Sequence, residues 1–181
     1  MRLPFSRWSG MCGPFGAAAA ALAVAGARAW AGDALSEDQI TKAAMIYNFG
    51  RFTTWPVERF ASASDPVVLC VDPASSLAAA LEAISGKPVG TRILMVRQTS
   101  RIDHSCQMAF VRRQDFSDSY LSALRDRGVL TIGESPGFTD MGAIQLVTIG
   151  RQIRFAINQK NALAAGAHLS SNLLRLAVAV H

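Results

Sequence analysis

The sequence predicts an α/β fold, with a mostly parallel sheet flanked by helices and a C-terminal antiparallel hairpin at its edge. Short, continuous apolar runs alternate with helical patterns, which is typical of parallel strands joined by crossover helices. Near the C-terminus the pattern changes to strict alternation on either side of the turn Gly150-Arg151, which predicts a hairpin with one buried face. No repeat or linker interrupts the pattern, so we expect one domain.

The N-terminal 31 residues have the layout of a secretory signal peptide. Arg2 and Arg7 form a positive n-region, an alanine-rich apolar run follows, and small residues favour cleavage after Ala31. We therefore assign 1–31 to the signal peptide and 32–181 to the domain. An uncleaved membrane anchor is the alternative, although the apolar run is short for a bilayer span.

Removal of the signal peptide changes the charge of the chain. The full sequence carries 18 basic and 13 acidic residues, a net charge of +5. Three arginines and no acidic residue lie in 1–31, so 15 basic and 13 acidic residues remain, a net charge of +2. The remaining basic residues are dispersed along the sequence. This balance argues against a nucleic-acid partner.

A helix is expected at the start of the domain. Ser36 and Gln39 form a capping-box pattern, and Gly50 and Pro56 are expected to end the helix. Apolar residues cover two sides of the segment 42–56, KAAMIYNFGRFTTWP, which favours a helix packed between partners.

The remaining elements follow in order along the chain. Strands are predicted at 66–72, 91–96, 106–111 and 129–132, helices at 75–86 and 117–127, hairpin strands at 143–149 and 152–158, and terminal helices at 161–166 and 170–180.

Two cysteines, Cys70 and Cys106, remain after processing. In an exported protein an even pair is interpreted first as a disulfide, because the compartment is oxidising. Two reduced core cysteines are the alternative. The cluster Asp103-His104-Ser105-Cys106 also allows a His-activated thiolate or half of a metal site, but the chain offers few further ligands.

No recognised catalytic or nucleotide-binding motif is present. The loop after the fourth predicted strand, GESPGF, contains Glu134 and Phe138 at a position where α/β folds bind ligands, and an ordinary turn is the alternative. Arg154 lies between apolar residues of the predicted hairpin and is a third candidate contact residue. His168 has no carboxylate nearby and fits a packing or capping role. We expect no enzyme, no cofactor and no metal site.

The sequence resembles the YfiR-like periplasmic proteins over nearly all of the mature chain. The resemblance begins with Tyr47-Asn48-Phe49-x-x-Phe52-x-x-Trp55-Pro56 and continues through Leu69-Cys70-Val71, Cys106 and Val129-Leu130-Thr131-Ile132 with Gly137-Phe138 and Gly142. It ends with Ile153-Arg154-Phe155-x-Ile157-Asn158 and Leu169-Ser170-Ser171-x-Leu173-Leu174.

This resemblance implies a periplasmic, non-enzymatic protein that represses a membrane-bound diguanylate cyclase, and thereby cyclic di-GMP signalling, by protein contact. The implied partners are the periplasmic region of an inner-membrane diguanylate cyclase or sensor, an outer-membrane lipoprotein, and a second copy of the chain in a homodimer. It also implies redox tuning, here through the single pair Cys70 and Cys106. A periplasmic small-ligand carrier or sensor, with its pocket at the loop of Glu134 and Phe138, is the alternative function.

Overall fold

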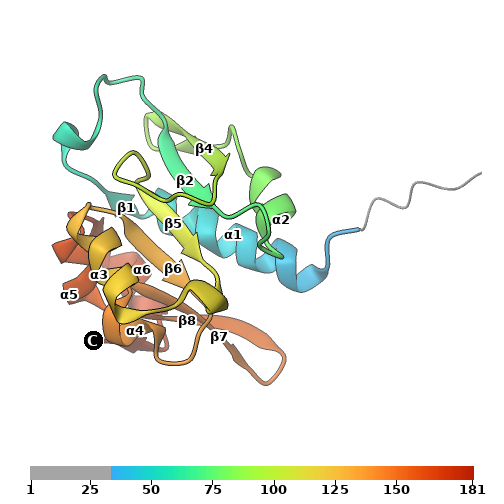
Figure 1. Cartoon of the computed structure of the whole chain (residues 1–181). Helices are drawn as coiled ribbons and strands as arrows, with labels where there is room; N and C mark the ends of the chain where they lie inside the picture. Colours follow the sequence, from blue (N-terminus) through green and yellow to red (C-terminus); the bar gives the residue numbers. More distant parts are fainter. Residues whose placement is uncertain (1–33) are drawn as a thin grey trace, which may run out of the picture. The chain divides into compact units, whose positions relative to one another are not determined.

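An eight-stranded mixed sheet forms the centre of the computed structural model, which describes residues 34–181 (Figure 1). Its strand order is β10-β8-β7-β6-β5-β2-β4-β3, and β1 and β9 form a separate two-stranded sheet. The predicted signal peptide, 1–31, lies outside the described residues. Residues 34–181 form one compact unit.

The strands are β1 Thr53–Thr54, β2 Val67–Val71, β3 Pro88–Val89, β4 Arg92–Gln98, β5 Met108–Val111, β6 Leu130–Gly133, β7 Ile144–Ile149, β8 Gln152–Ile157, β9 His168–Leu169 and β10 Ala179–Val180. The helices are α1 Glu37–Arg51, α2 Ala78–Glu82, α3 Asp118–Asp126, α4 Phe138–Met141, α5 Gln159–Ala164 and α6 Ser171–Leu176, with 3-10 turns η1 Val57–Arg59 and η2 Arg113–Asp115.

The predicted fold class is confirmed. Strands β4, β2, β5, β6 and β7 run parallel, and β8 returns antiparallel to β7 through the turn at Gly150, whose φ is +60°. One detail differs from the prediction: β8 is not the outermost strand of the sheet. Residues Ala179 and Val180, predicted to be helical, instead pair in parallel with Ala156 and Ile157 of β8. Helix α6 ends earlier, at Leu176.

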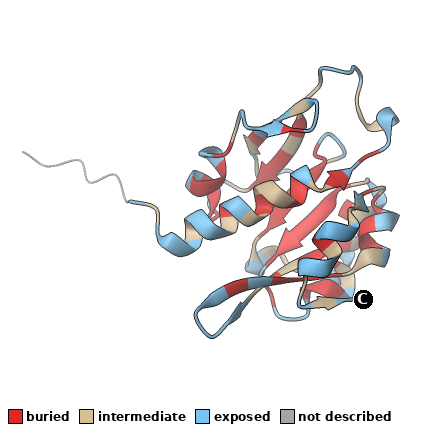
Figure 2. Cartoon of the chain, turned by 180° about the vertical axis from the view of Figure 1, so that it is seen from behind, coloured by how far each residue is buried: buried red, intermediate tan, exposed pale blue. Residues whose placement is uncertain are grey.

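Two hydrophobic cores lie on the two faces of the sheet, because successive strand side chains point to opposite sides. Along β2, Leu69 and Val71 belong to the core that includes residues of α1 and α2, whereas Cys70 belongs to the core that includes residues of α3. Helix α3 lies on the face turned to the viewer in Figure 1, and α1 crosses the opposite face, which Figure 2 presents. Buried residues are concentrated in the strands between these layers.

Helix α1 begins as the sequence predicts. The Ser36 N–H donates to Gln39 Oε1 at 2.8 Å and the Gln39 N–H donates to Ser36 Oγ at 3.2 Å, which completes the capping box. The helix meets the predicted burial on two sides only in part, because Ala43 and Tyr47 of the second side contact the domain whereas Ile40 and Ala44 are exposed. Its buried residues are Ala43, Ile46, Phe49 and Gly50, which lie toward the sheet, whereas Ile40 is 54% exposed. The helix therefore covers one face of the sheet, and it ends at Arg51, before Trp55.

The connection between β4 and β5 contains no helix. It leaves β4, crosses β2 on the face that carries α3 and enters β5 on the other side of β2, as the strand order requires. The outward residues Ile93 and Met95 of β4 are accordingly 48% and 44% exposed. Helices thus cover both faces of the sheet centre but only one face of β4. Among residues 34–181, no helix has the length and apolar character that a membrane crossing requires.

Candidate functional site

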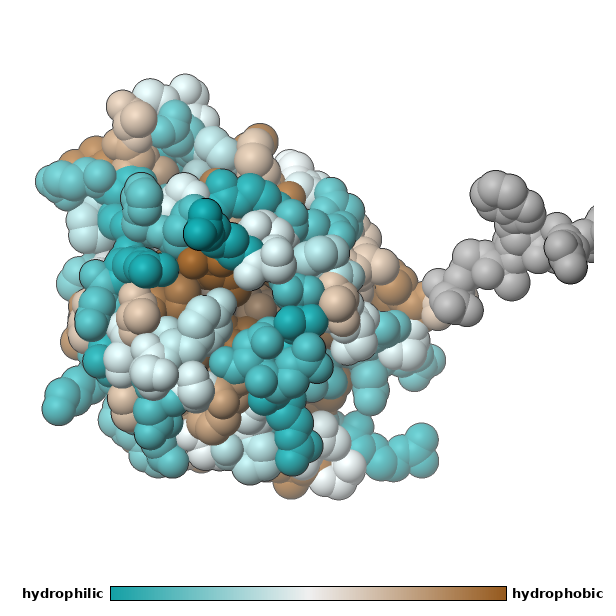
Figure 3. Space-filling view, in the orientation of Figure 1, coloured by the Kyte–Doolittle hydropathy of each residue, from teal (hydrophilic) through white to brown (hydrophobic). Residues whose placement is uncertain are grey.

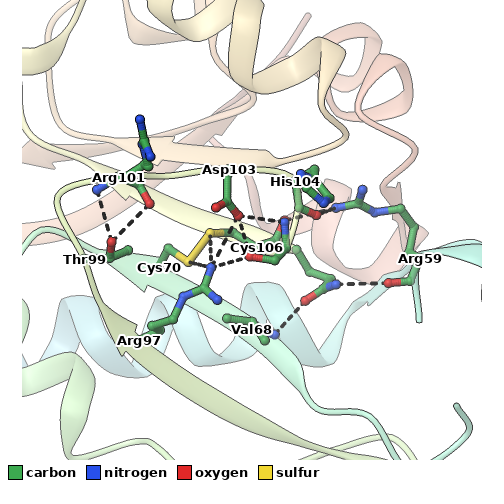
Figure 4. The surroundings of a disulfide bond; sticks show 11 residues. Arg59, Val68, Cys70, Arg97, Thr99, Arg101, Asp103, His104 and Cys106 are labelled. Carbon is green, nitrogen blue, oxygen red and sulfur yellow. Dashed lines mark hydrogen bonds and ion pairs between the residues drawn. A yellow bond between two sulfur atoms is a disulfide. The ribbon is translucent and has the colours of Figure 1, made fainter. Parts of the chain in front are cut away.

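A disulfide joins the central strand β2 to a cysteine two residues before β5. Cys70 and Cys106 have bonded sulfurs 2.09 Å apart and Cα atoms 5.8 Å apart, and both residues are fully buried (Figure 4). In this state neither sulfur is a free thiolate or a metal ligand. Among the described residues, no group of three or more His, Cys, Asp or Glu side chains is placed to hold a metal ion.

The disulfide anchors the helix-free connection 99–106 to the sheet. Within this connection only Ile102 and Cys106 are buried, and both belong to the core on the α3 face. The remaining residues are exposed or half-buried and make mostly local hydrogen bonds, such as that from the Arg101 N–H to Thr99 Oγ1 at 3.1 Å. Loss of the disulfide would therefore remove the covalent anchor of this segment and leave Ile102 as its one remaining buried apolar side chain outside Cys106.

The Arg97 guanidinium covers the sulfurs on the solvent side. Its Nη2 atom lies 3.3 Å from Cys70 Sγ and 3.2 Å from Cys106 Sγ, and it donates to Ser105 Oγ at 2.6 Å (Figure 4). It also forms an ion pair with Asp103 at 3.6 Å. Hydrogen bonds from the Ser105 hydroxyl and backbone N–H lower the pKa of the Asp103 carboxyl, and the charge of Arg97 adds to this effect. The carboxylate therefore stays ionised and helps to orient Arg97.

This geometry has a chemical consequence for the thiol–disulfide equilibrium. A cation next to sulfur stabilises a thiolate and lowers its pKa. Arg97 is therefore placed to stabilise the reduced form of the pair and to raise its reduction potential. In the oxidised form it shields the sulfurs, so an attacking thiolate reaches them only after Arg97 moves.

Two further side chains hold the backbone beside Cys106. Arg59 donates from Nη2 to the carbonyl oxygens of His104 and Cys106, at 3.1 and 3.0 Å, and from Nη1 to that of Arg127 at 3.1 Å. Burial lowers the pKa of its guanidinium. Gln107 accepts from the Val68 N–H at 2.8 Å and donates to the Arg59 carbonyl at 3.2 Å. Reduction of the disulfide should consequently loosen residues before Cys106 rather than β5.

The three predicted contact residues Glu134, Phe138 and Arg154 do not form one site. Glu134 pairs with Lys42 of α1 at 3.0 Å and lines a cavity of about 230 Å³ beside β7. Arg154 is exposed on β8 opposite Val147 and is not among the residues lining that cavity. The pocket expected for the alternative function thus retains only Glu134.

Phe138 is a core residue, and its prediction as a surface contact is wrong. It is fully buried and belongs to the core on the α3 face. A Cβ atom placed on Gly133 or Gly142 would overlap its ring, so the two glycines form the slot that accepts it. The spacing G-x-x-x-x-F-x-x-x-G provides that slot, whereas the sequence prediction placed Phe138 in a loop that binds a ligand or partner.

Sequence reasoning also missed Arg97 and Arg59. Neither residue stands out in the sequence, since an arginine that lies near a cysteine only in space has no sequence signature. His168 is exposed in β9 and pairs in register with Thr54 of β1.

Comparison with known proteins agrees with this architecture. The family model described as YfiR/HmsC-like matches residues 39–178, which include every strand of the eight-stranded sheet except β10. Among curated proteins, none matches this sequence. A crystal structure of a conserved domain protein from Vibrio cholerae O1 biovar El Tor is similar, with a TM-score of 0.50 and 10% sequence identity. The match covers 77% of this chain and 60% of that one, and at this identity it shows the fold alone.

These observations define the class of the protein. It is an α/β domain with a buried disulfide and without a recognised catalytic motif. The chain belongs to the YfiR/HmsC-like family. Members of this family are known in general as periplasmic regulators of diguanylate cyclases.

Proposed function

We propose that this protein is a periplasmic repressor that holds an inner-membrane diguanylate cyclase inactive by contacting its periplasmic region. The observation that carries the proposal is the family match over residues 39–178. The predicted export signal and the oxidised cysteine pair agree with a periplasmic location. Repression by contact requires no catalytic residues, which fits the side-chain arrangement around the disulfide.

The redox state of Cys70 and Cys106 tunes the repressor in this proposal. An external dithiol would break the Sγ–Sγ bond, leave two cysteine thiols and become a disulfide itself. Connection 99–106 would then lose its covalent anchor to β2, while the backbone of Cys106 would remain held by Arg59. The change is thus confined to an exposed segment, where it can alter a contact surface without unfolding the domain.

Two further partners belong to the proposal. An outer-membrane lipoprotein would sequester the repressor and free the cyclase, and the repressor would form a homodimer. Affinity capture from membranes and the molar mass of the purified protein in solution test these partners separately. A monomer across the micromolar range would remove the homodimer from the proposal without affecting repression.

The central test is deletion of the gene followed by measurement of cellular cyclic di-GMP. We expect the level to rise and to return to normal when the unchanged protein is supplied. An unchanged level, together with no membrane cyclase recovered by affinity capture, would refute the repressor function.

A matched pair of variants tests the redox step. The Cys70→Ala/Cys106→Ala variant should repress independently of added reductant, whereas the Arg97→Gln variant keeps the disulfide and should be reduced at a lower potential. Equal reduction potentials of the Arg97→Gln variant and the unchanged protein would contradict the role of Arg97.

A further inference from the structure

A crevice lies at the carboxyl ends of β2, β4 and β5. From β2 the chain continues to β4 on one side, and then returns to β5 on the other side. This reversal makes the gap between β2 and β5 the topological switch point of the sheet. Open α/β sheets bind ligands in the crevice outside the strand ends at this point.

The crevice has the size of a small-molecule site. Its volume is about 460 Å³, within the range of roughly 300 to 1,000 Å³ that ligand pockets occupy. The apolar part of its lining comes from Ile102, Phe110, Phe116 and Tyr120. Figure 3 views the face that carries α3 and shows a hollow with an apolar floor and a hydrophilic rim.

Three charged side chains line the crevice and leave it with an excess of one negative charge. Arg112 pairs with Asp72 at 3.1 Å, and its Nε and Nη2 donate to the two carboxylate oxygens of Asp115 at 2.6 and 3.1 Å. The Asp72 side chain is only 13% exposed. One guanidinium therefore neutralises only one of the two carboxylates, so the side chains that line the crevice have a net charge of −1.

The electrostatics of Tyr120 agree with this charge count. Burial raises the pKa of its phenol, and the carboxylates of Asp115 and Asp72 raise it further, against the opposing effect of Arg112 and Arg127. The two carboxylates therefore lie close enough to the phenol to act on it. An aromatic wall beside two carboxylates suits a cationic ligand, since the ring face attracts cations as well.

We infer that this crevice binds a small primary amine, with its ammonium group at Asp72 and Asp115 and its apolar or aromatic body against Phe116 and Tyr120. The ammonium group supplies three N–H donors. Its positive charge balances the carboxylate charge that Arg112 leaves unneutralised. A carboxylate or phosphate ligand would meet the excess negative charge and should be excluded. This inference is independent of the proposed repressor function, because it concerns equilibrium binding to the isolated protein.

A series of three ligands with nearly the same skeleton and different charge tests the inference. Binding of 2-phenylethylamine, 2-phenylethanol and phenylacetate would be measured by calorimetry on the purified protein at low salt. We expect the amine to bind with a Kd below about 1 mM, the alcohol about tenfold more weakly, and the anion not at all. Equal affinities for the three ligands, or no binding of the amine up to about 5 mM, would overturn the inference.

Variants locate the binding site. Asp72→Asn should weaken amine binding about tenfold, because the crevice then has no net charge. Asp126→Asn removes the same charge at a side chain that is 73% exposed at the end of α3, and it should leave the affinity unchanged. If Asp72→Asn fails to fold, Asp115→Asn serves the same purpose. Equal affinities of the correctly folded crevice variant and the Asp126→Asn variant would place the amine elsewhere and refute the site.

Discussion

Removal of the disulfide should destabilise the domain by an amount set mainly by the length of the loop that it closes. Cys70 and Cys106 are 36 residues apart. The chain-entropy relation for a loop of this length gives about 4 kcal/mol of lost stability at 25 °C. For a domain of this size, 1 kcal/mol lowers the melting temperature by about 2 to 4 °C. We therefore expect the Cys70→Ala/Cys106→Ala variant to melt about 8 to 16 °C below the unchanged protein.

The measurement is urea and thermal unfolding followed by circular dichroism. Each single cysteine variant should lose about as much stability as the double variant, since either change removes the same bond. Reduction of the unchanged protein should reproduce the loss and needs no substitution in the core. A loss below about 1 kcal/mol in the double variant would refute the reasoning, because connection 99–106 would then need no covalent anchor.

Three further outcomes follow from local contacts. Gly142→Ala should cost about 3 kcal/mol in urea unfolding, because the new Cβ would overlap the fully buried ring of Phe138; a cost below about 1 kcal/mol would contradict the slot. Because the pKa of the Asp103 carboxyl is lowered in the folded protein, its ionised form stabilises the fold. This stabilisation is complete above the unfolded pKa of about 3.9 and is lost as the pH falls through the lower pKa of the folded state. Ser105→Ala should therefore raise the carboxyl pKa measured by NMR toward its ordinary value and flatten the stability profile at acidic pH, and an unchanged pKa would exclude the hydroxyl hydrogen bond as the cause of the lowered pKa. Ser36→Ala should cost about 1 kcal/mol in the same unfolding assay, and a cost near zero would show that the cap of α1 is redundant.

Local sequence patterns predicted the individual elements well where local physics decides them. Ser36 and Gln39 satisfy each other's backbone donors within the same helical turn, so the capping box itself is encoded locally, and Gln39 Nε2 additionally donates to the Ser76 carbonyl at 2.7 Å. The continuous apolar run around Leu69 predicted a strand buried on both faces, and Leu69 and Cys70 are indeed both fully buried. The hairpin followed from alternation about a turn in which Gly150 adopts a positive φ.

The errors occurred where neighbours decide the environment of a residue. The apolar residue Ile40 was assigned to a buried side of α1, but near the start of the helix its side chain stays 54% exposed. Phe138 follows a turn sequence that usually lies at the surface, yet the two glycines open a slot for its ring in the core. The last residues continue a helical pattern, but the open edge of β8 offers backbone hydrogen bonds that convert Ala179 and Val180 to a strand.

The sequence by itself determined the α/β class, the order of the main elements, the single cysteine pair of the domain and the family resemblance, because each rests on residue type and spacing. Only the tertiary structure decided that Arg97 covers the sulfurs and that Asp72, Arg112 and Asp115 meet at one crevice. The physical reason is the sheet order. A chain reversal between β4 and β5 brings the ends of separate strands together, and residue spacing along the sequence does not encode that distance.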